Sequence, residues 1–140
     1  MATISSFMLC ESSQNLPNGQ GGIVQQLIGP VTTLRPQYIP GNYSFSASVG
    51  VIGLDMQKDN SMRFVLKAPS GDMLNDLGEA PLPVAAPDNV LPKEYGGFVA
   101  CIDFRNVVIP EPGVYSLEVH INGELIGTKD IPIYGRSVTV

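Results

Sequence analysis

The sequence predicts an all-β protein, a two-sheet antiparallel β-sandwich of about eight strands. The strongest observation is the C-terminal stretch Ile109–Tyr134, where Val119 and Ile121 alternate with polar neighbours. Asn122-Gly123 follows and supplies the two residues that a tight hairpin turn requires. Turn-forming residues also recur about every ten positions between short alternating segments, as in sandwiches. No segment shows sustained helical periodicity.

The expected extended segments are short and are bounded by Gly, Pro, Asn, Asp and Ser. They are Thr3–Glu11, Ile23–Val31, Tyr43–Leu54, Met62–Ala68, Gly97–Arg105 and the two hairpin strands, with Met73–Leu77 as either a strand or a helical turn. Ser12–Gly22 is expected to be a polar loop, and Arg35–Asn42 a corner. In Tyr43–Leu54 apolar residues alternate with serines, which predicts one buried face and one solvated face.

Leu82–Pro92 is too rich in proline for a central strand. We expect it to cross between the two sheets. Such a crossing favours a sandwich over the alternative, an up-and-down barrel, because those barrels join neighbouring strands by tight turns. At 140 residues the chain is expected to be a single domain, residues 1–140, large enough to fold without a metal or a disulfide.

The formal net charge is −5, and the eight Lys and Arg residues are scattered. This argues against nucleic acid as a partner, because phosphate binding needs a basic face. No polybasic cluster indicates a membrane surface. The N-terminal residues lack the basic start of a signal peptide, and no apolar run approaches the length of a membrane span. We therefore expect a soluble, cytoplasmic protein with no membrane partner.

The candidate catalytic side chains are few. Cys10 and Cys101 stand in apolar runs and are expected to be reduced, buried thiols, although a disulfide between them stays open. His120 is the single histidine, and a lone histidine cannot build a zinc site, which needs three or four ligands. We expect it on the solvent side or at the edge of the hairpin. No nucleophile elbow of the form G-x-S-x-G occurs. The sequence therefore predicts neither an enzyme nor a cofactor.

Loop carboxylates offer one candidate metal site. Asp55 and Asp59 follow one strand, and Asp72 and Asp76 follow another. Carboxylates gathered at one end of a sandwich can share a Ca²⁺ ion, which accepts six to eight oxygens in irregular geometry. Their spacing is not that of an EF-hand, and aspartate is also favoured in turns for its bonds to the backbone.

The segment Leu82–Pro92 is unusually apolar for a surface loop. Val84, Val90 and Leu91 are its candidate partner-binding residues, because long loops on a rigid sandwich often carry recognition and exposed apolar segments mark partner sites. The alternative is that these side chains cap the open end of the core.

Two resemblances add to this interpretation. Pro112-Gly113-Val114-Tyr115 resembles the strand-entry corner of immunoglobulin-like domains, in which the tyrosine hydroxyl bonds back to nearby backbone. Phe7-Met8-Leu9-Cys10-Glu11, then a loop and Gly22-Ile23, resemble the opening of a family of small uncharacterised bacterial proteins. Phe104–Ile133, with its Pro-Glu-Pro-Gly-x-Tyr motif, resembles the end of the same family. Where that family has a basic or aliphatic stretch after the first glycine, this chain has Gln25-Gln26. The resemblance implies a sandwich and a bacterial or phage source, and it implies no activity.

Together these observations predict an immunoglobulin-like or C2-like sandwich that acts as a non-enzymatic interaction module, through a protein partner or through self-association. The alternatives are a calcium-dependent, C2-like binding module and a structural subunit of a larger phage or secretion assembly. A hydrolase that uses His120 as its base is a further alternative.

Overall fold

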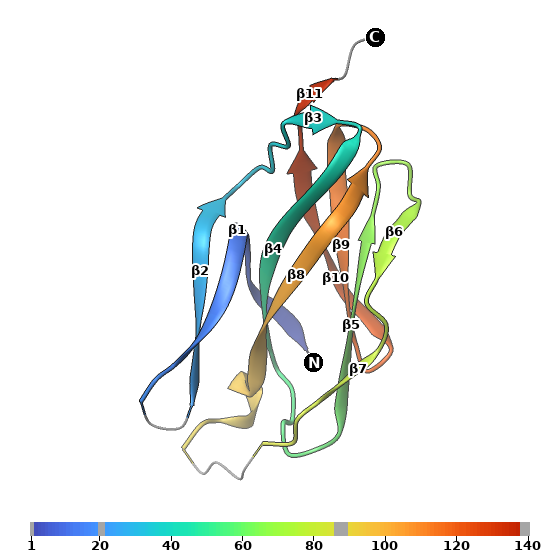
Figure 1. The fold of residues 1–140 in the computed structure, drawn as a ribbon. Coiled ribbons are helices and arrows are strands. Elements are labelled where there is room, and N and C mark those ends of the chain that lie inside the picture. The colour runs from blue at the N-terminus through green and yellow to red at the C-terminus, as the bar shows by residue number, and fades with distance from the viewer. Residues whose placement is uncertain (1, 20–21, 86–89, 138–140) are drawn as a thin grey trace.

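The structure is a computed structural model that describes residues 2–19, 22–85 and 90–137. It is a two-layer sandwich in which almost every element is a strand (Figure 1). Within the described residues the one helical turn is a 3₁₀ turn, Lys93–Tyr95. The strands are β1 (Thr3–Pro17), β2 (Ile23–Val31), β3 (Tyr38–Ile39), β4 (Gly41–Ile52), β5 (Asn60–Lys67), β6 (Met73–Asp76), β7 (Ala80–Leu82), β8 (Gly97–Ile109), β9 (Gly113–Ile121), β10 (Glu124–Ile133) and β11 (Arg136–Ser137).

Two antiparallel sheets form the layers. The first has the strand order β2-β1-β4-β8, and the second has the order β10-β9-β5-β6, with β7 also paired to β5. Without β2, the first sheet has the A-B-E order of an immunoglobulin domain, and β10-β9-β5 has its G-F-C order. The predicted two-sheet antiparallel sandwich is confirmed. Its two sheets contain nine strands of the described residues where about eight were expected, and β3 and β11 form a separate two-stranded sheet.

The core lies between the sheets and follows the predicted alternation. Phe45 of β4 and Phe104 of β8 stack with their ring centroids 4.8 Å apart. From the second sheet, β9 contributes every other residue to this core. Its inward-facing side chains, all buried, are Tyr115, Leu117, Val119 and Ile121. The period of two in the sequence therefore reports the core-facing side correctly for both sheets.

The predicted tyrosine corner is present between β8 and β9. The Tyr115 hydroxyl donates a hydrogen bond to the Glu111 carbonyl oxygen at 2.5 Å and accepts one from the Glu111 N–H at 3.4 Å. Burial raises the pKa of this hydroxyl, because an ionised phenolate is poorly solvated in the core. The corner joins one sheet to the other at the position where immunoglobulin domains place it.

The predicted C-terminal hairpin is also confirmed. Asn122 and Gly123 have φ angles of 53° and 79°, the left-handed values of a two-residue hairpin turn. The same Asn122 side chain accepts a hydrogen bond from the Ser61 N–H at 2.9 Å, which ties the turn to the start of β5.

The predicted polar loop Ser12–Gly22 is wrong for Ser12–Pro17, because β1 continues as a strand through Pro17, and residues 20–21 of that range lie outside the described part of the chain. The residues after Glu11 pair with β2, and Gln14 donates a cross-strand hydrogen bond to Gln26 at 2.7 Å. Strand pairing with Ile23–Val31, a segment predicted correctly, overrides the turn propensity of these polar residues.

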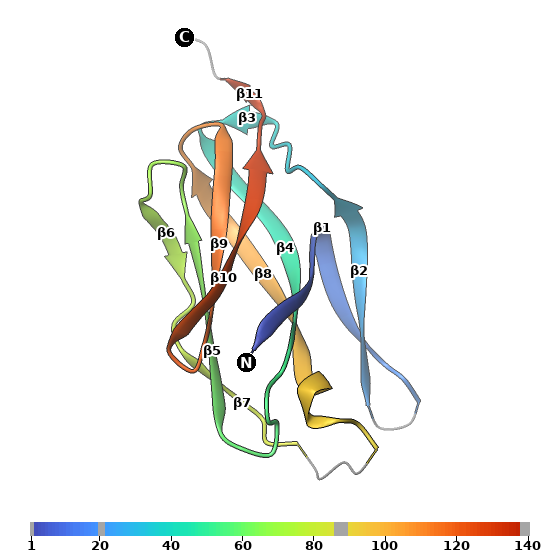
Figure 2. The same ribbon diagram turned by 180° about the vertical axis from the view of Figure 1, so that it is seen from behind.

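The outer half of this hairpin, which we call the arm, comprises Ser12–Pro17 and Ile23–Ile28. In Figures 1 and 2, β1 runs along β4 and then turns back sharply, so that the arm descends beside the sheet. Gly29, opposite Glu11 in the register, has a φ of 66° that only glycine adopts readily. The bend directs the arm over the outer face of its own sheet.

The predicted solvated face of β4 is therefore wrong. Ser46 and Ser48 point away from the core, yet they are only 2 % and 8 % exposed. The Asp103 carboxylate of β8 accepts hydrogen bonds from both Ser46 and Ser13, and Ser13 belongs to the arm. The arm thus covers the serine face that the alternation alone assigns to solvent.

The remaining connections follow the predictions with small changes. Met73–Leu77 forms a strand (β6) rather than a helical turn, and the proline-rich segment after β7 crosses from the second sheet to the first. The corner 35–42 contains the short strand β3, which pairs in parallel with β11. The Leu34 N–H donates a hydrogen bond to the Pro132 carbonyl oxygen, and the Leu34 carbonyl oxygen accepts one from the Tyr134 N–H. These bonds anchor the chain after the arm to the end of β10.

Candidate interaction surface

The crossing between β7 and β8 lies at one end of the sandwich, the lower end in Figure 1. Val84, Val90 and Leu91 are 55 %, 91 % and 48 % exposed, and Tyr95 beside them is exposed as well. We call these four residues and the hollow beside them the basal surface. The three predicted partner-binding residues are thus at the surface rather than capping the core, and their binding role stays a prediction. The neighbouring residues 86–89 lie outside the described part of the chain.

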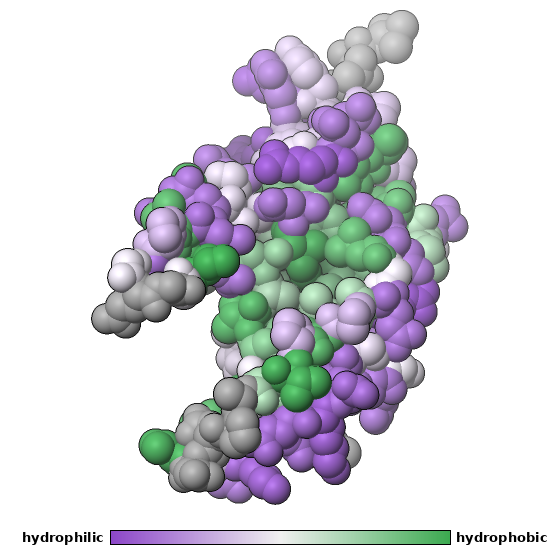
Figure 3. Space-filling model, turned by 60° about the horizontal axis from the view of Figure 1, so that its bottom comes forward, coloured by the Kyte–Doolittle hydropathy of each residue, from purple (hydrophilic) through white to green (hydrophobic). Residues whose placement is uncertain are grey.

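The hollow of the basal surface has a volume of about 210 Å³. Backbone hydrogen bonds hold its walls, from the Ala85 N–H to the Met56 carbonyl at 2.8 Å and from the Leu54 N–H to the Gly96 carbonyl at 2.9 Å. Seen from below, apolar residues gather in a recess at this end of the molecule (Figure 3). The residues that line the hollow are Leu54, Asp55, Met56, Gln57, Ala85, Leu91, Pro92, Lys93, Gly96 and Gly97.

Charged side chains border the hollow. Asp55 accepts a hydrogen bond from the Gln57 N–H at 3.1 Å and lies 4.0 Å from the Lys58 ammonium group. Lys93 also lines the hollow. An apolar centre with a polar border is the usual anatomy of a protein–protein interface.

A second recess lies between the arm and the outer face of β4 and β8. The Gln25 side chain spans it, donating to the Val99 carbonyl oxygen at 3.5 Å and accepting a hydrogen bond from the Cys101 thiol at 3.1 Å. No lining residue is charged: they are Asn15, Ile23, Gln25, Leu27, Ser48 and Val99. The arm was not predicted to form any surface of this kind. The one signal that could have found it is the complete absence of charged residues from Ser12 to Leu34.

The two cysteines are free thiols on either side of β4. Cys10 is fully buried as predicted, and burial is the main cause that raises its thiol pKa. Cys101 is partly exposed beneath the arm rather than buried. Cys10 pairs with Ser46 and Cys101 pairs with Ser48, so the two thiols flank β4 without being directly opposite each other.

The four candidate calcium ligands do not meet. Asp55 and Asp59 precede β5, whereas Asp72 follows it, and the eight residues of β5 separate the two loops. Asp76 lies in β6 and its carboxylate is bound by the Arg63 guanidinium group. In the ranges 2–19, 22–85 and 90–137, no three His, Cys, Asp or Glu side chains form a group that could hold a metal ion.

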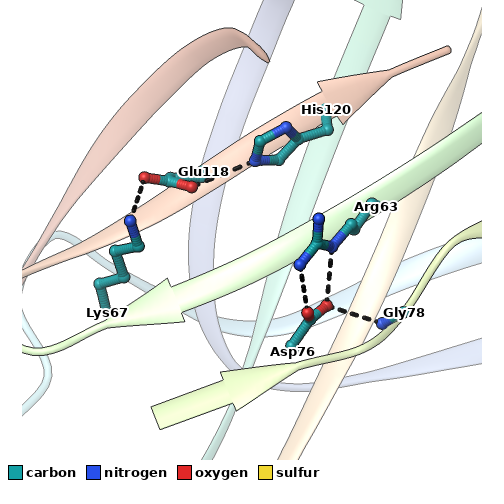
Figure 4. A network of polar contacts seen from close by, with 6 residues as sticks. All are labelled: Arg63, Lys67, Asp76, Gly78, Glu118 and His120. Atoms are coloured by element: carbon teal, nitrogen blue, oxygen red, sulfur yellow. Dashed lines mark hydrogen bonds and ion pairs between the residues drawn. The ribbon is translucent and has the colours of Figure 1, made fainter. Parts of the chain in front are cut away.

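Charged side chains occupy the outer face of the second sheet instead (Figure 4). The Arg63 hydrogen bonds and the Gly78 N–H hold the pKa of Asp76 down at about 2, from an ordinary 3.8. One strand away, the Lys67 ammonium group lies 2.9 Å from Glu118, and His120 lies 3.1 Å from the same carboxylate. Hydrogen bonds from Lys67 and His120 lower the pKa of Glu118.

His120 is therefore on the outer face, as predicted, but it is not solvated freely. Its side chain is 19 % exposed and its contact is with Glu118. The nearby Ser61 hydroxyl donates to Glu79 at 2.6 Å. Within the described residues no serine or cysteine bonds to His120, so the geometry does not assemble a nucleophile and its base.

The sequence matches one known family over most of its length. The pattern of a family described as "Family of unknown function (DUF6941)" matches residues 5–134. The chain belongs to this family. This confirms the resemblance to small uncharacterised proteins that its two ends indicated, while the bacterial or phage source stays a prediction.

Among solved structures, an immunoglobulin-like protein from Pseudomonas aeruginosa is similar at a TM-score of 0.39 and 11 % identity, covering 96 % of this chain and 97 % of that chain. No curated protein sequence matches the chain. The described residues contain no helix long and apolar enough to span a membrane.

Proposed function

We propose that this immunoglobulin-like sandwich is a non-enzymatic interaction module that binds another protein through its basal surface. The observation that supports this most is the exposure of Val84, Val90 and Leu91 beside an apolar hollow with a charged border. Clustered apolar side chains at a protein surface lose contact with water when a partner covers them, which favours association.

The size of the hollow favours a protein partner over a small molecule. Its volume of about 210 Å³ is below the roughly 300–1,000 Å³ of ordinary ligand pockets. A hollow of this size fits one apolar side chain of a partner, and such buried anchors provide much of the affinity of protein interfaces. The partner is therefore expected to present an apolar anchor that enters between Met56 and Leu91.

The test is binding of full-length wild-type protein and of a Val84→Asp/Val90→Asp variant to proteins of a bacterial lysate. Val108→Asp/Val114→Asp is the matched control, because both of those valines are exposed and lie in other parts of the sandwich. We expect one protein to bind wild type and the control but not the basal variant. Binding of that purified protein should then weaken at least tenfold in the basal variant alone.

A partner retained equally by all three proteins would contradict the basal surface as the binding site. Thermal unfolding of each variant shows whether the sandwich is intact, so that loss of binding is separated from loss of the fold.

The calcium-dependent alternative has weaker support, because β5 separates Asp55 and Asp59 from Asp72, and Arg63 binds Asp76. We expect a calorimetric titration of the protein with Ca²⁺ to release no heat of binding. A saturable signal that Asp55→Asn abolishes would restore this alternative.

A further inference from the structure

Strand β2 leaves one long edge of the first sheet without a partner. It is the terminal strand in the order β2-β1-β4-β8, and no described strand pairs with its other side. An open edge presents backbone N–H and C=O groups that can pair with another strand. Ile23, Val24 and Ile28 are exposed along this edge.

This edge differs from the others in its lack of protection. Sheet edges in natural proteins usually carry charges, proline or short strands that prevent pairing with other chains. The other edge strands of this sandwich follow that rule. Their charged or proline residues are Asp103 and Arg105 on β8, Asp76 on β6, Pro81 on β7, and Glu124, Lys129, Asp130 and Pro132 on β10. On β2 the only such residue is Pro30, near its end, so Ile23–Ile28 is unprotected.

The uncharged stretch also restricts what can pair there. The chain carries a net charge of −5, so two copies repel each other wherever their charged surfaces meet. Between Ser12 and Leu34 there is no charge to repel. A two-fold arrangement that places the arms of two copies side by side therefore avoids like-charge contacts at its centre.

We propose that β2 pairs with β2 of a second copy of this chain, antiparallel and centred on Gln26. In that register Gln26 lies opposite Gln26 of the other copy, and Val24 lies opposite Ile28. On the face that carries Gln26, apolar Val24 then meets apolar Ile28, and the two Gln26 amides, which both donate and accept, meet each other. On the opposite face Gln25 lies opposite Leu27.

The side chain of Gln26 in the arm has a hydrogen-bonding group available for this pairing. The Gln26 side-chain carbonyl oxygen accepts a hydrogen bond from Gln14, and within the described residues the Gln26 amide nitrogen has no hydrogen-bond partner. Pairing of two copies extends the Gln14–Gln26 contact into a row of four glutamines. This row crosses the four arm strands, which are β1 and β2 of each copy. This interface is separate from the basal surface, so a Val84→Asp/Val90→Asp variant is expected to associate as wild type does.

The test is sedimentation velocity of the full-length protein over a range of concentrations. We expect a concentration-dependent dimer for wild type and a dissociation constant at least tenfold larger for Gln26→Lys, because a charge is then placed opposite its own copy. Thr128→Lys is the matched control, since it adds the same charge to the β10 edge and should leave the dimer unchanged.

A mixing experiment tests the register itself. Gln26→Lys and Gln26→Glu should each be monomeric, and an equimolar mixture should restore the dimer, because position 26 then pairs opposite charges. Circular dichroism checks that both variants fold. A monomeric wild type, a dimer that Gln26→Lys leaves intact, or a mixture that stays monomeric would each overturn the proposal.

Discussion

Two hairpins of this molecule each carry an Asn-Gly pair after their first strand, yet they occupy different places in the fold. The β9–β10 hairpin turns at Asn122-Gly123, and the β1–β2 hairpin begins its turn at Asn18-Gly19, where Gly19 has a φ of 80°. The first hairpin is a wall of the core, with Leu117 and Val119 fully buried. The arm of the second is mostly exposed and bends away from the core.

The difference lies in the strands on either side of each turn. Strands β9 and β10 alternate apolar and polar residues, so each presents one continuous apolar face to the opposite sheet. The arm has glutamines and serines on both faces, with isolated apolar residues between them. A turn motif therefore determines that two strands pair, whereas the alternation determines whether the pair joins a core.

The largest expected difference between the hairpins concerns large-to-small substitutions. Leu117→Ala should lower the free energy of unfolding by about 2–5 kcal/mol, because it leaves a cavity in a closely packed core. Leu27→Ala, in the partly exposed arm, should cost less than about 1 kcal/mol. Urea denaturation measures both, and equal losses would show that the arm is part of the cooperative core.

The tyrosine corner gives a smaller effect. Tyr115→Phe should lower the free energy of unfolding by about 1–2 kcal/mol, because the Glu111 carbonyl loses its hydrogen bond in a partly buried site. Tyr134→Phe, at an exposed tyrosine, is the control and should have almost no effect. Thermal unfolding measures the loss of stability in both variants. If Tyr115→Phe were as stable as wild type, the hydrogen bond of the Tyr115 hydroxyl would contribute nothing to stability.

Each hairpin contains a glycine with a left-handed backbone conformation, and substitution of these two glycines by alanine compares the hairpins directly. Gly123→Ala should destabilise the protein by about 1–2 kcal/mol, the cost of that conformation for alanine. Gly29→Ala has the same strain and a crowded Glu11 side chain, but the arm can open locally to relieve both. We expect Gly29→Ala to increase hydrogen exchange of the arm amides while changing global stability less than Gly123→Ala does.

The smallest expected effect is the response to acid. The pKa of Asp76 is lower in the folded protein, at about 2, than its ordinary 3.8, so its ion pair contributes stability above pH ~4 that is lost as the pH falls toward 2. Asp76→Asn should flatten the decline of the melting temperature in this range. The arm contains no titratable residue. After correction for the intrinsic pH dependence of hydrogen exchange, the protection of the arm amides should therefore fall together with that of the sandwich, with no separate acid transition.

Several features were predictable from the sequence because they depend on residues close together in the chain. The Asn122-Gly123 turn, the alternation of β9 and the tyrosine corner each depend on a few neighbouring residues. The prolines around Val84, Val90 and Leu91 predicted that this segment is not a central strand, but the sequence left open whether these side chains are exposed or cap the core. The sequence thus determined the sandwich and the segment that crosses between its sheets, whereas the exposure of that segment's apolar side chains came from the structure.

Only the tertiary structure decided what covers each outer face. The alternation predicted solvated serines on β4, since a period of two distinguishes the two faces of a strand but does not show what packs on either. The bend at Glu11 and Gly29 brings the arm over Ser46 and Ser48 from a distant part of the chain. The separation of the acidic loops by β5 is likewise a matter of three-dimensional placement, because loops adjacent in sequence can lie at opposite ends of the strand between them.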